Sequence, residues 1–251
     1  METIKVVELE GAAAAGSSNL RFFLKGVAVA TPFLYNKDMK KIPFYSNLKD
    51  NNHCIQACLK MVIKYYFPAK NYSFKELDKM SKHKKGMWTW QGASLLALAD
   101  MGLEVVNIEN IDYKKFAEQG EMYLQNIWSE EVFATQDKYS DLKQEKKIAQ
   151  KMVESKKMKL ANRDAKFSDV EGYFAKDYLV LVSVNPCVFE NKKCYWSHIV
   201  LITDINDRWV TFHDVGLPPV ENRKISRKIF EKAMTKPWKE DTNVIALKYE
   251  K

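Results

Sequence analysis

The 251-residue chain is poor in arginine and cysteine, and it has no long apolar run. Only five of its 40 basic residues are arginine, and its lysines are scattered rather than clustered. Proteins that read a nucleic-acid sequence favour arginine, because the guanidinium group makes bidentate contacts with base edges. The net charge of +8 therefore indicates a lysine-rich solvated surface, and we expect no nucleic-acid partner.

Four cysteines are too few to hold a chain of this length together as a disulfide framework. The spacings Cys54-x3-Cys58 and Cys187-x6-Cys194 differ from the two-residue gap of zinc-binding loops, and no histidine pair completes a ligand set. We therefore expect no metal site. A Cys187–Cys194 disulfide across a short hairpin stays open as an alternative, and it would need an oxidising compartment.

No stretch reaches the roughly 18 apolar residues that indicate a membrane-spanning helix. The apolar segment 22–34 is short, Lys25 interrupts it, and no basic region precedes it as in a signal peptide. We therefore predict a soluble, cytoplasmic protein without a membrane span, and secretion is the alternative. The sequence does not indicate an oligomeric state.

The hydrophobic fraction of 46% is enough to bury one sizeable core. A run of small residues at 11–19 is typical of a linker. We therefore predict an N-terminal extension, residues 1–41, and a single domain, residues 42–251. Within and next to the extension, alternating or apolar patterns predict short strands at 3–10, at about 21–35 and at 41–46.

Helices are expected in the first part of the domain. Apolar residues at helical spacing predict one over 54–67, and a capping box of Ser73 and Glu76 predicts the start of a second. A third is expected over 94–101, with a short strand after it. The charged region 111–176 predicts surface helices, the last of them capped by Ser168.

Strands dominate the last third of the chain. Apolar runs separated by turn residues predict strands at 178–186, 195–207, 208–216 and 243–251, with a helix over 223–234. Helices first and an antiparallel sheet second is the order of an α+β fold. The boundary between the two halves is the natural place for a site.

Cys54 stands where a polar loop turns into the first expected helix. A thiol at a helix N-terminus has a lowered pKa, and its thiolate is a nucleophile. Cys58 follows one turn later on the same helix face and fits a buried structural cysteine. We therefore take Cys54 as the candidate nucleophile, while its neighbour His53 is expected to point elsewhere.

A thiol nucleophile also needs a base and a group that orients the base. His198 begins the apolar strand SHIVLITDI, and Asp214 lies in the next strand, WVTFHDVG. Neighbouring antiparallel strands allow this carboxylate to accept a hydrogen bond from the imidazole and to hold its tautomer. His213 is expected to face the other side of its strand and His83 to lie on the surface, so neither is assigned to the site.

Together these motifs resemble the double-glycine leader peptidases and their free-standing relatives, cysteine peptidases of the family 39 type in the papain clan. The resemblance covers about residues 42–249 and is carried by IPFYSN-x6-CIQACLKMVIKYY, by G-x5-GASLLALADMGL and by the last third. It implies a papain-like α+β fold, with an N-terminal helical half packed on a C-terminal antiparallel sheet. It also implies a catalytic triad of Cys54, His198 and Asp214. The interval of 144 residues between Cys54 and His198 fits the roughly 130–150 of papain-type enzymes.

Two positions depart from the family pattern. The chain has His53-Cys54-Ile55 where the family usually has Asp-Cys-Gly. It has Asn47 where the family places a glutamine whose side-chain amide helps to form the oxyanion hole. Asparagine offers the same donor on a shorter side chain, and loss of such a donor costs roughly 2.7–4 kcal/mol of transition-state stabilisation.

The pattern therefore predicts a cysteine-dependent peptidase that cleaves an amide bond of a peptide or protein substrate through a Cys54 thioester. The catalytic residues would be Cys54, His198, Asp214 and Asn47, with no metal or organic cofactor. Two alternatives remain: an acyltransferase or deamidase with the same triad, and a catalytically weak binding module of the same fold. An aromatic set could shape substrate subsites or simply pack in the core: Trp88, Trp90, Tyr195 and Trp196.

Overall fold

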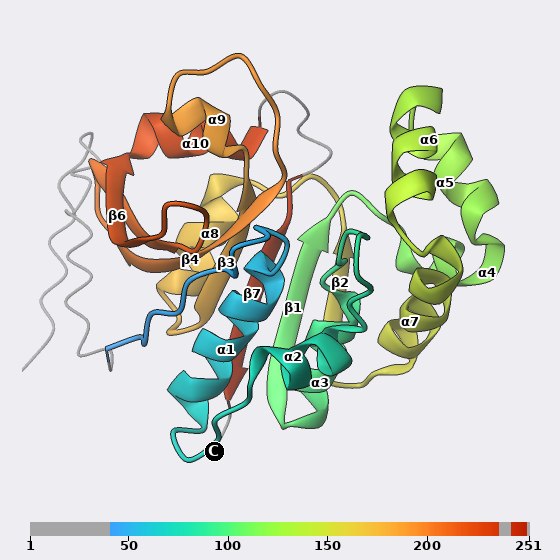
Figure 1. Ribbon diagram of the computed structural model, residues 1–251, viewed down its shortest axis with the longest axis horizontal. Helices are drawn as coiled ribbons and strands as arrows, with labels where there is room; N and C mark the ends of the chain where they lie inside the picture. The colour runs from blue at the N-terminus through green and yellow to red at the C-terminus, as the bar shows by residue number, and fades with distance from the viewer. Residues whose placement is uncertain (1–40, 236–241, 250–251) are drawn as a thin grey trace, which may run out of the picture. The chain divides into compact units, whose positions relative to one another are not determined.

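The structure is a computed structural model that describes residues 41–235 and 242–249 (Figure 1). The strands expected at 3–10 and about 21–35 and the linker at 11–19 lie outside the described residues, so the boundary at residue 41 stays a prediction. The strand expected at 41–46 is wrong, since this segment has no regular secondary structure. Pro43 lacks the N–H that a strand needs, and single bonds hold the segment instead, such as that from His213 Nε2 to the Ile42 carbonyl at 3.2 Å.

Within residues 41–235 and 242–249, one sheet of seven strands lies at the centre of the fold, in the order β2-β1-β7-β3-β4-β5-β6. β1 and β2 are parallel, and the other neighbouring strands are antiparallel. The strands are β1 (Leu103–Glu109), β2 (Met158–Asn162), β3 (Leu179–Val184), β4 (His198–Ile205), β5 (Trp209–Asp214), β6 (Val220–Ser226) and β7 (Val244–Tyr249).

Ten helices accompany the sheet in the described part of the chain. They are α1 (Cys54–Tyr66), α2 (Phe74–Ser81), α3 (Gly92–Asp100), α4 (Tyr113–Gln119), α5 (Glu121–Ile127), α6 (Glu130–Tyr139), α7 (Leu142–Glu154), α8 (Phe167–Phe174), α9 (Pro186–Phe189) and α10 (Arg227–Thr235). α1 and the capping box of α2 confirm the expected helix starts at Cys54 and after Ser73. α8 begins at Phe167, so Ser168 lies inside that helix and does not cap it.

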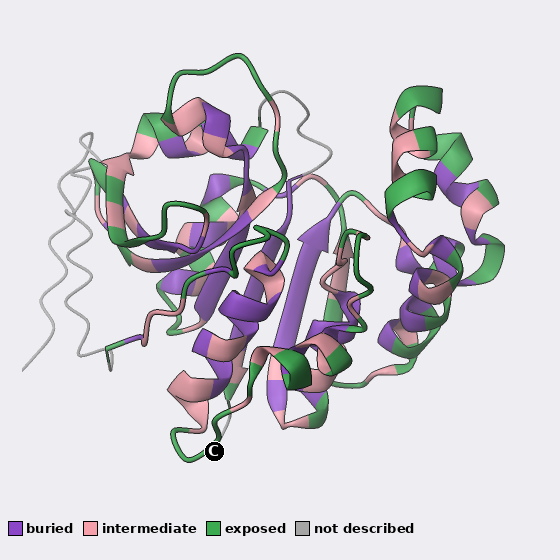
Figure 2. Ribbon diagram, viewed as in Figure 1, coloured by how far each residue is buried: buried purple, intermediate pink, exposed green. Residues whose placement is uncertain are grey.

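Both faces of the sheet are covered by helices. Since successive residues of a strand point to opposite sides, alternate residues of one strand pack in two different cores. On β3, Leu179 and Leu181 join a core with α1, α3 and α7, whereas Val180 and Val182 join a second core with α8 and α10. Figure 2 shows the buried strands between these helical layers. Burial on both faces explains why β3, β4 and β7 are nearly continuous apolar runs, whereas β6 at the edge of the sheet is polar and largely exposed.

The structure is a mixed α+β fold, but it corrects the expected order of helices first and sheet second. β1 and β2 come from the expected helical half and form one edge of the sheet, in a parallel pair that the pattern did not predict. The helix expected over 223–234 is wrong in its first part. Residues up to Ser226 belong to β6, which pairs with β5, and α10 begins only at Arg227.

The Cys187–Cys194 disulfide, left open by the sequence, is present in the structure. It joins α9 to the loop that leads into β4, rather than the two strands of a hairpin. Disulfides are rare in reducing compartments, so this bond favours the alternative of secretion over a cytoplasmic location. The localisation stays a prediction. Among the described residues, no helix is both long and apolar enough to span a membrane.

Candidate active site

Cys54 is the first residue of α1, and His53 is the residue that precedes the helix. The first bond within the helix runs from Ala57 N to the His53 carbonyl at 2.9 Å. In the described part of the chain, no side chain caps this end. The N–H groups of the first turn are therefore available to a negative charge at the Cys54 sulfur or on a bound substrate.

His198, the first residue of β4, lies between Cys54 and Asp214. Its Nε2 is 2.9 Å from Asp214 Oδ1, so Nδ1 is the ring nitrogen that stays available to the Cys54 sulfur, with which the ring interacts. Burial disfavours the protonated ring, but the bonds to Asp214 and Cys54 and their charges raise the pKa of His198 to about 9. The three predicted residues are thus brought together in one row.

Cys54 and Cys58 differ although they are one turn apart on the same helix. Burial alone would raise the pKa of Cys54, but the hydrogen bond and the charge of His198 lower it below the ordinary thiol value. Cys58 is fully enclosed, with its sulfur 3.8 Å from the Ile199 carbonyl, and burial raises its pKa well above the ordinary value. The structure therefore confirms that Cys58 is a buried core cysteine.

Asp214, the last residue of β5, is held by more than His198. Its Oδ1 also accepts a hydrogen bond from Gly216 N at 3.1 Å, and its Oδ2 accepts one from Arg223 Nη1 at 3.1 Å. Burial would raise the pKa of this carboxyl, but these partners lower it, so the group stays ionised. Arg223 was missed by the sequence analysis, because it lies on β6, where a helix was expected.

Gly216 is a second residue of the site that the sequence marked only as a turn. A Cβ atom at this position would lie 3.2 Å from Asp214 Oδ1 and 3.4 Å from His198 Nε2. The first distance is shorter than ordinary van der Waals contact and the second is at its lower limit, so a larger residue would press on the Asp214 carboxylate. Space next to the imidazole therefore favours glycine at this position.

Asn47 is buried and lies beside the loop that leads into α1. Its side-chain oxygen accepts hydrogen bonds from Leu48 N and His53 N, both at 2.8 Å, and its Nδ2 donates one hydrogen to Asn51 Oδ1 at 3.1 Å. An amide nitrogen carries two hydrogens, so at most one remains for an oxyanion. The structure thus places Asn47 against the backbone next to Cys54, while its catalytic role stays a prediction.

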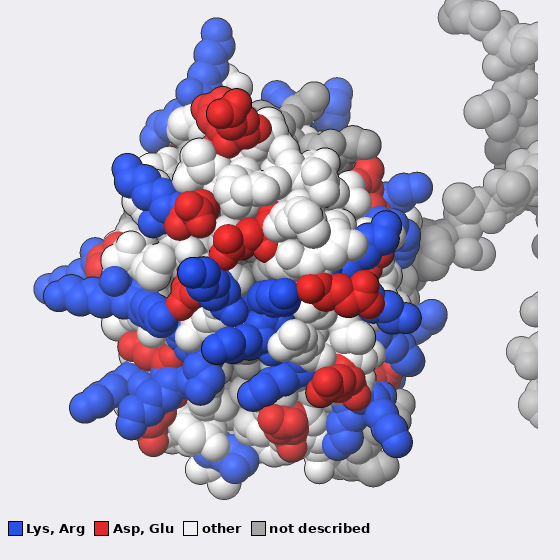
Figure 3. Space-filling view, turned by 90° about the vertical axis from the view of Figure 1, so that its right-hand side faces the viewer, with Lys and Arg blue, Asp and Glu red and all other residues white. Residues whose placement is uncertain are grey.

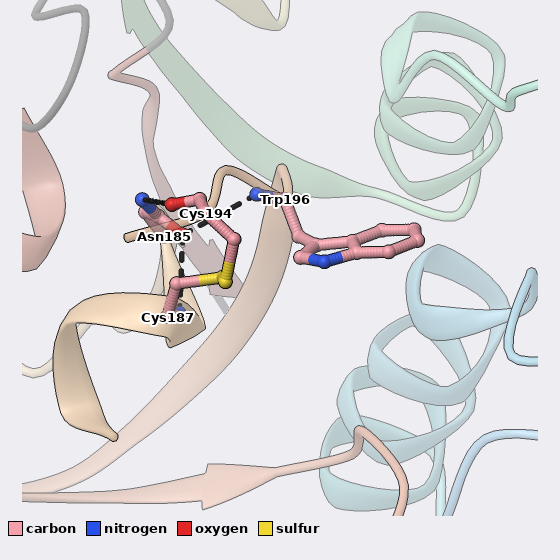
Figure 4. The surroundings of a disulfide bond; sticks show 4 residues. All are labelled: Asn185, Cys187, Cys194 and Trp196. Atoms are coloured by element: carbon pink, nitrogen blue, oxygen red, sulfur yellow. Dashed lines mark hydrogen bonds between the residues drawn. A yellow bond between two sulfur atoms is a disulfide. The ribbon is translucent and has the colours of Figure 1, made fainter. Parts of the chain in front are cut away.

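Trp88, Trp90 and Trp196 have different surroundings. Trp88 stacks on Tyr139 with ring centroids 5.2 Å apart, and Trp90 packs against Phe116 in the helical layer. Trp196 is 66% exposed and lies two residues before His198. Figure 4 shows its indole projecting away from the disulfide, on a loop that Asn185 holds through the Cys194 carbonyl and Trp196 N.

Basic side chains lie on the face of the molecule that carries α4 to α7, with acidic groups between them (Figure 3). A hollow of about 360 Å³ on this face is lined by Lys143, Lys146 and Lys147 of α7. Mixed charges of this kind fit the solvated surface that the composition indicates.

No family model matches the chain, and no curated protein matches its sequence. Among solved structures, the chain is similar to the peptidase domain of Streptococcus ComA, a bifunctional ABC transporter involved in a quorum-sensing pathway. The two are 15% identical, the match covers 84% of this chain and 100% of that one, and the TM-score is 0.48. A likeness of this size carries no argument about activity, which depends on the side-chain geometry given above.

Proposed function

We propose that this protein is a cysteine-dependent peptidase of papain-like fold, related to the double-glycine leader peptidases. One observation carries the proposal: the hydrogen-bonded row of His198, Asp214 and Arg223, in which the imidazole acts on the Cys54 thiol and lowers its pKa. Each member favours the charged state of the next, because anionic and cationic groups alternate along it. A structural cysteine such as Cys58 needs only to pack in the core and requires no imidazole or carboxylate beside it.

The first half of the reaction is the attack of the Cys54 thiolate on an amide carbonyl carbon. His198 holds the proton that came from the thiol, and Asp214 keeps the ring oriented and stabilises its positive charge. The C–N bond breaks as His198 gives that proton to the leaving amine. This step leaves a thioester on Cys54 and a neutral imidazole.

In the second half, water attacks the thioester and His198 takes up one of its protons. The carboxylic acid product leaves, and the thiolate–imidazolium pair forms again. The oxyanion of each tetrahedral intermediate would lie at the uncapped start of α1, where the Cys54 N–H and the remaining Asn47 N–H can donate to it. No cofactor enters these steps.

The expected substrate is a peptide or a protein. The exposed indole of Trp196, two residues before His198 in the sequence, would offer an apolar surface to such a substrate. A substrate residue of apolar character would pack there. This assignment of Trp196 follows from its place in the loop, and it fits the part that the sequence analysis left open for the aromatic residues.

Two other functions fit part of the same geometry. An acyltransferase or deamidase would use the same three side chains, with an amine in place of water or a glutamine side chain as the substrate. A binding module would need none of them, and the departures at His53 and Asn47 favour it. The intact row at Cys54 favours the enzyme.

The decisive experiment is alkylation by iodoacetamide at pH ~6, followed by peptide mapping, in the wild type and in His198→Ala. A free thiol, with a pKa of ~8.5, reacts slowly at this pH, whereas a thiolate paired with imidazolium reacts fast. We expect fast labelling of Cys54 that is lost in His198→Ala, with Cys58 unlabelled as the internal control. Slow labelling that the variant leaves unchanged would rule out the peptidase and favour the binding module.

If Cys54 is reactive, product analysis separates the remaining alternatives. A mixed peptide substrate is incubated with and without a primary amine. Free carboxylic acid and a new amino terminus indicate hydrolysis, whereas an amine adduct or released ammonia indicates transfer or deamidation.

A further inference from the structure

A second group of polar side chains lies on the other side of the start of α1. His53, Asp78 and His83 each offer one ligand atom, and these atoms all lie within 4.8 Å of one another. The proposed peptidase mechanism uses none of the three. They come from three elements, namely the residue before α1, the helix α2 and the segment that follows α2.

The local fold explains why Asp78 and His83 meet. α2 packs against α1, which brings Asp78 to His53, whose ring is buried. Lys82, the residue that follows α2, is in the left-handed conformation, with φ of 56°, and the chain turns back on itself there. His83 N then donates to the Asp78 carbonyl at 2.9 Å, which fixes the two residues side by side.

Both imidazoles are oriented by a partner outside the group. His53 Nδ1 is 2.9 Å from Asp50 Oδ1, and His83 Nδ1 is 2.7 Å from Thr89 Oγ1. In each ring, Nε2 therefore stays available as a ligand atom that faces the other members of the group. Histidines that bind metals are held in this way, with the second ring nitrogen bonded to a carboxylate or another oxygen.

Asp78 supplies a buried oxygen atom without a hydrogen-bond donor among the described residues. Its Oδ1 has no hydrogen-bond partner, and His53 Nε2 lies 3.3 Å away. Tetrahedral zinc, with bonds of about 2.0–2.1 Å, holds neighbouring ligand atoms about 3.3 Å apart. The pair already has this spacing, and His83, whose ligand atom lies within 4.8 Å of the other two, would have to move by at most about 1.5 Å to reach it.

We propose that His53, Asp78 and His83 form a binding site for a divalent transition-metal ion of the zinc class, with a fourth position open to water. Two imidazoles and one carboxylate are a ligand set that zinc accepts, and Asp50 and Thr89 complete the surroundings. The ion would join the start of α1 to α2 and to the segment after it. The rival arrangement is a proton on His53 shared with Asp78, without any ion.

The test is a titration of the full chain with Zn²⁺, after removal of metals with EDTA and without any affinity tag. It is made on Cys54→Ser, because a thiolate next to an imidazole is itself a zinc-binding pair. This choice also makes the result independent of the proposed peptidase activity. Calorimetry should give one Zn²⁺ per chain, and Co²⁺ as a second probe should give the visible absorption bands of a tetrahedral site.

Two variants identify the ligands, each made on the Cys54→Ser chain. Asp78→Asn keeps the size of the side chain and His83→Ala removes one imidazole. Both should weaken Zn²⁺ binding by more than the roughly 10–100-fold that follows from loss of an outer partner. Asp137→Asn, an exposed carboxylate on α6, is the matched control and should bind as tightly as the parent.

Circular dichroism and thermal unfolding without metal establish that the variants fold. If His83→Ala does not fold, the near-isosteric Asp78→Asn still decides the question. The proposal is overturned if the Cys54→Ser chain binds no stoichiometric Zn²⁺, or if Asp78→Asn and Asp137→Asn bind it equally well. Either result would leave the proton between His53 and Asp78 as the explanation of their contact.

Discussion

His53 and Cys54 are consecutive residues at the start of α1, yet they face two different chemical environments. Cys54 turns to the sheet, where His198, Asp214 and Arg223 stand on three adjacent strands. His53 turns to α2 and the loops around it. Neighbouring strands have a fixed register, so the first environment is rigid, whereas the second depends on a short helix and on turns.

The imidazoles of His53 and His198 differ in the groups that lie at their two ring nitrogens. His198 has a carboxylate on one nitrogen and a thiol on the other, so a proton can pass between the ring and sulfur. His53 has a carboxylate at each nitrogen and a second imidazole beside it, with ring centroids 4.7 Å apart. Both rings have a carboxylate at one nitrogen. A thiol at the other nitrogen makes His198 suited to proton transfer, whereas a second carboxylate and a nearby imidazole make His53 suited to the proposed metal site.

The largest expected effects come from two variants, one in each environment, that should each change a single property. His198→Ala should lower the alkylation rate of Cys54 at pH ~6 by roughly 100-fold, because the sulfur returns to an ordinary thiol that is mostly protonated. Zn²⁺ affinity, measured with Cys54→Ser also present, should not change. His83→Ala should weaken Zn²⁺ binding and leave the alkylation rate of Cys54 unchanged, when that rate is measured in EDTA. Loss of both properties in either variant would mean that the two environments are one coupled site.

The sequence predicted those parts of the fold that depend on local signals. α1 followed from apolar spacing and α2 from the capping box of Ser73 and Glu76. β6 was missed because residues 223–226 continue the helical spacing of α10, and only pairing with β5 makes them a strand. β2 was missed because its partner β1 is distant in the sequence and no short-range pattern indicates a parallel pair.

The same division holds for the site residues. Cys54, His198 and Asp214 lie at element boundaries that the sequence shows, so their order and spacing predicted that they meet. Arg223 depends on the register of β6 and could not be placed. His83 was expected on the surface but is half-buried, since its position depends on the left-handed turn at Lys82, which no motif announces.

A smaller effect is expected at Asp50, which touches only the His53 side. Asp50→Asn should weaken Zn²⁺ binding by roughly 10–100-fold, because His53 loses the carboxylate that orients its ring. Calorimetry on the Cys54→Ser chain measures the change. Asp112→Asn, a change at the cap of α4, is the control and should have no effect. Equal binding in both variants would remove Asp50 from the account.

Arg223 sharpens the comparison on the Cys54 side. Arg223→Gln removes the cation from Asp214, so the carboxylate holds the imidazolium less well, and the alkylation rate at pH ~6 should fall by about tenfold. Arg163→Gln removes the comparable Arg163–Asp169 contact elsewhere on the surface and should leave the rate unchanged. An unchanged rate in Arg223→Gln as well would show that His198 and the Gly216 N–H suffice to hold Asp214.

The smallest expected effect concerns the stability of α2, which carries Asp78. Ser73→Ala removes the cap and should lower the free energy of opening of this helix by about 1 kcal/mol, so its amide hydrogens exchange about fivefold faster. Ser129→Ala should do the same to α6, which carries no proposed ligand. These two variants form a matched pair.

Zn²⁺ then separates the two helices in a hydrogen-exchange experiment on the Cys54→Ser chain. The ion binds only when α2 is in place, so it should slow exchange in α2 and reverse the effect of Ser73→Ala. Exchange in α6 should be the same with and without Zn²⁺. α2 is short and few contacts hold it, so an ion bound by Asp78 must slow the exchange of its amide hydrogens. If Zn²⁺ leaves exchange in α2 unchanged, Asp78 does not bind the ion. The contacts of His53 would then be hydrogen bonds and ion pairs alone.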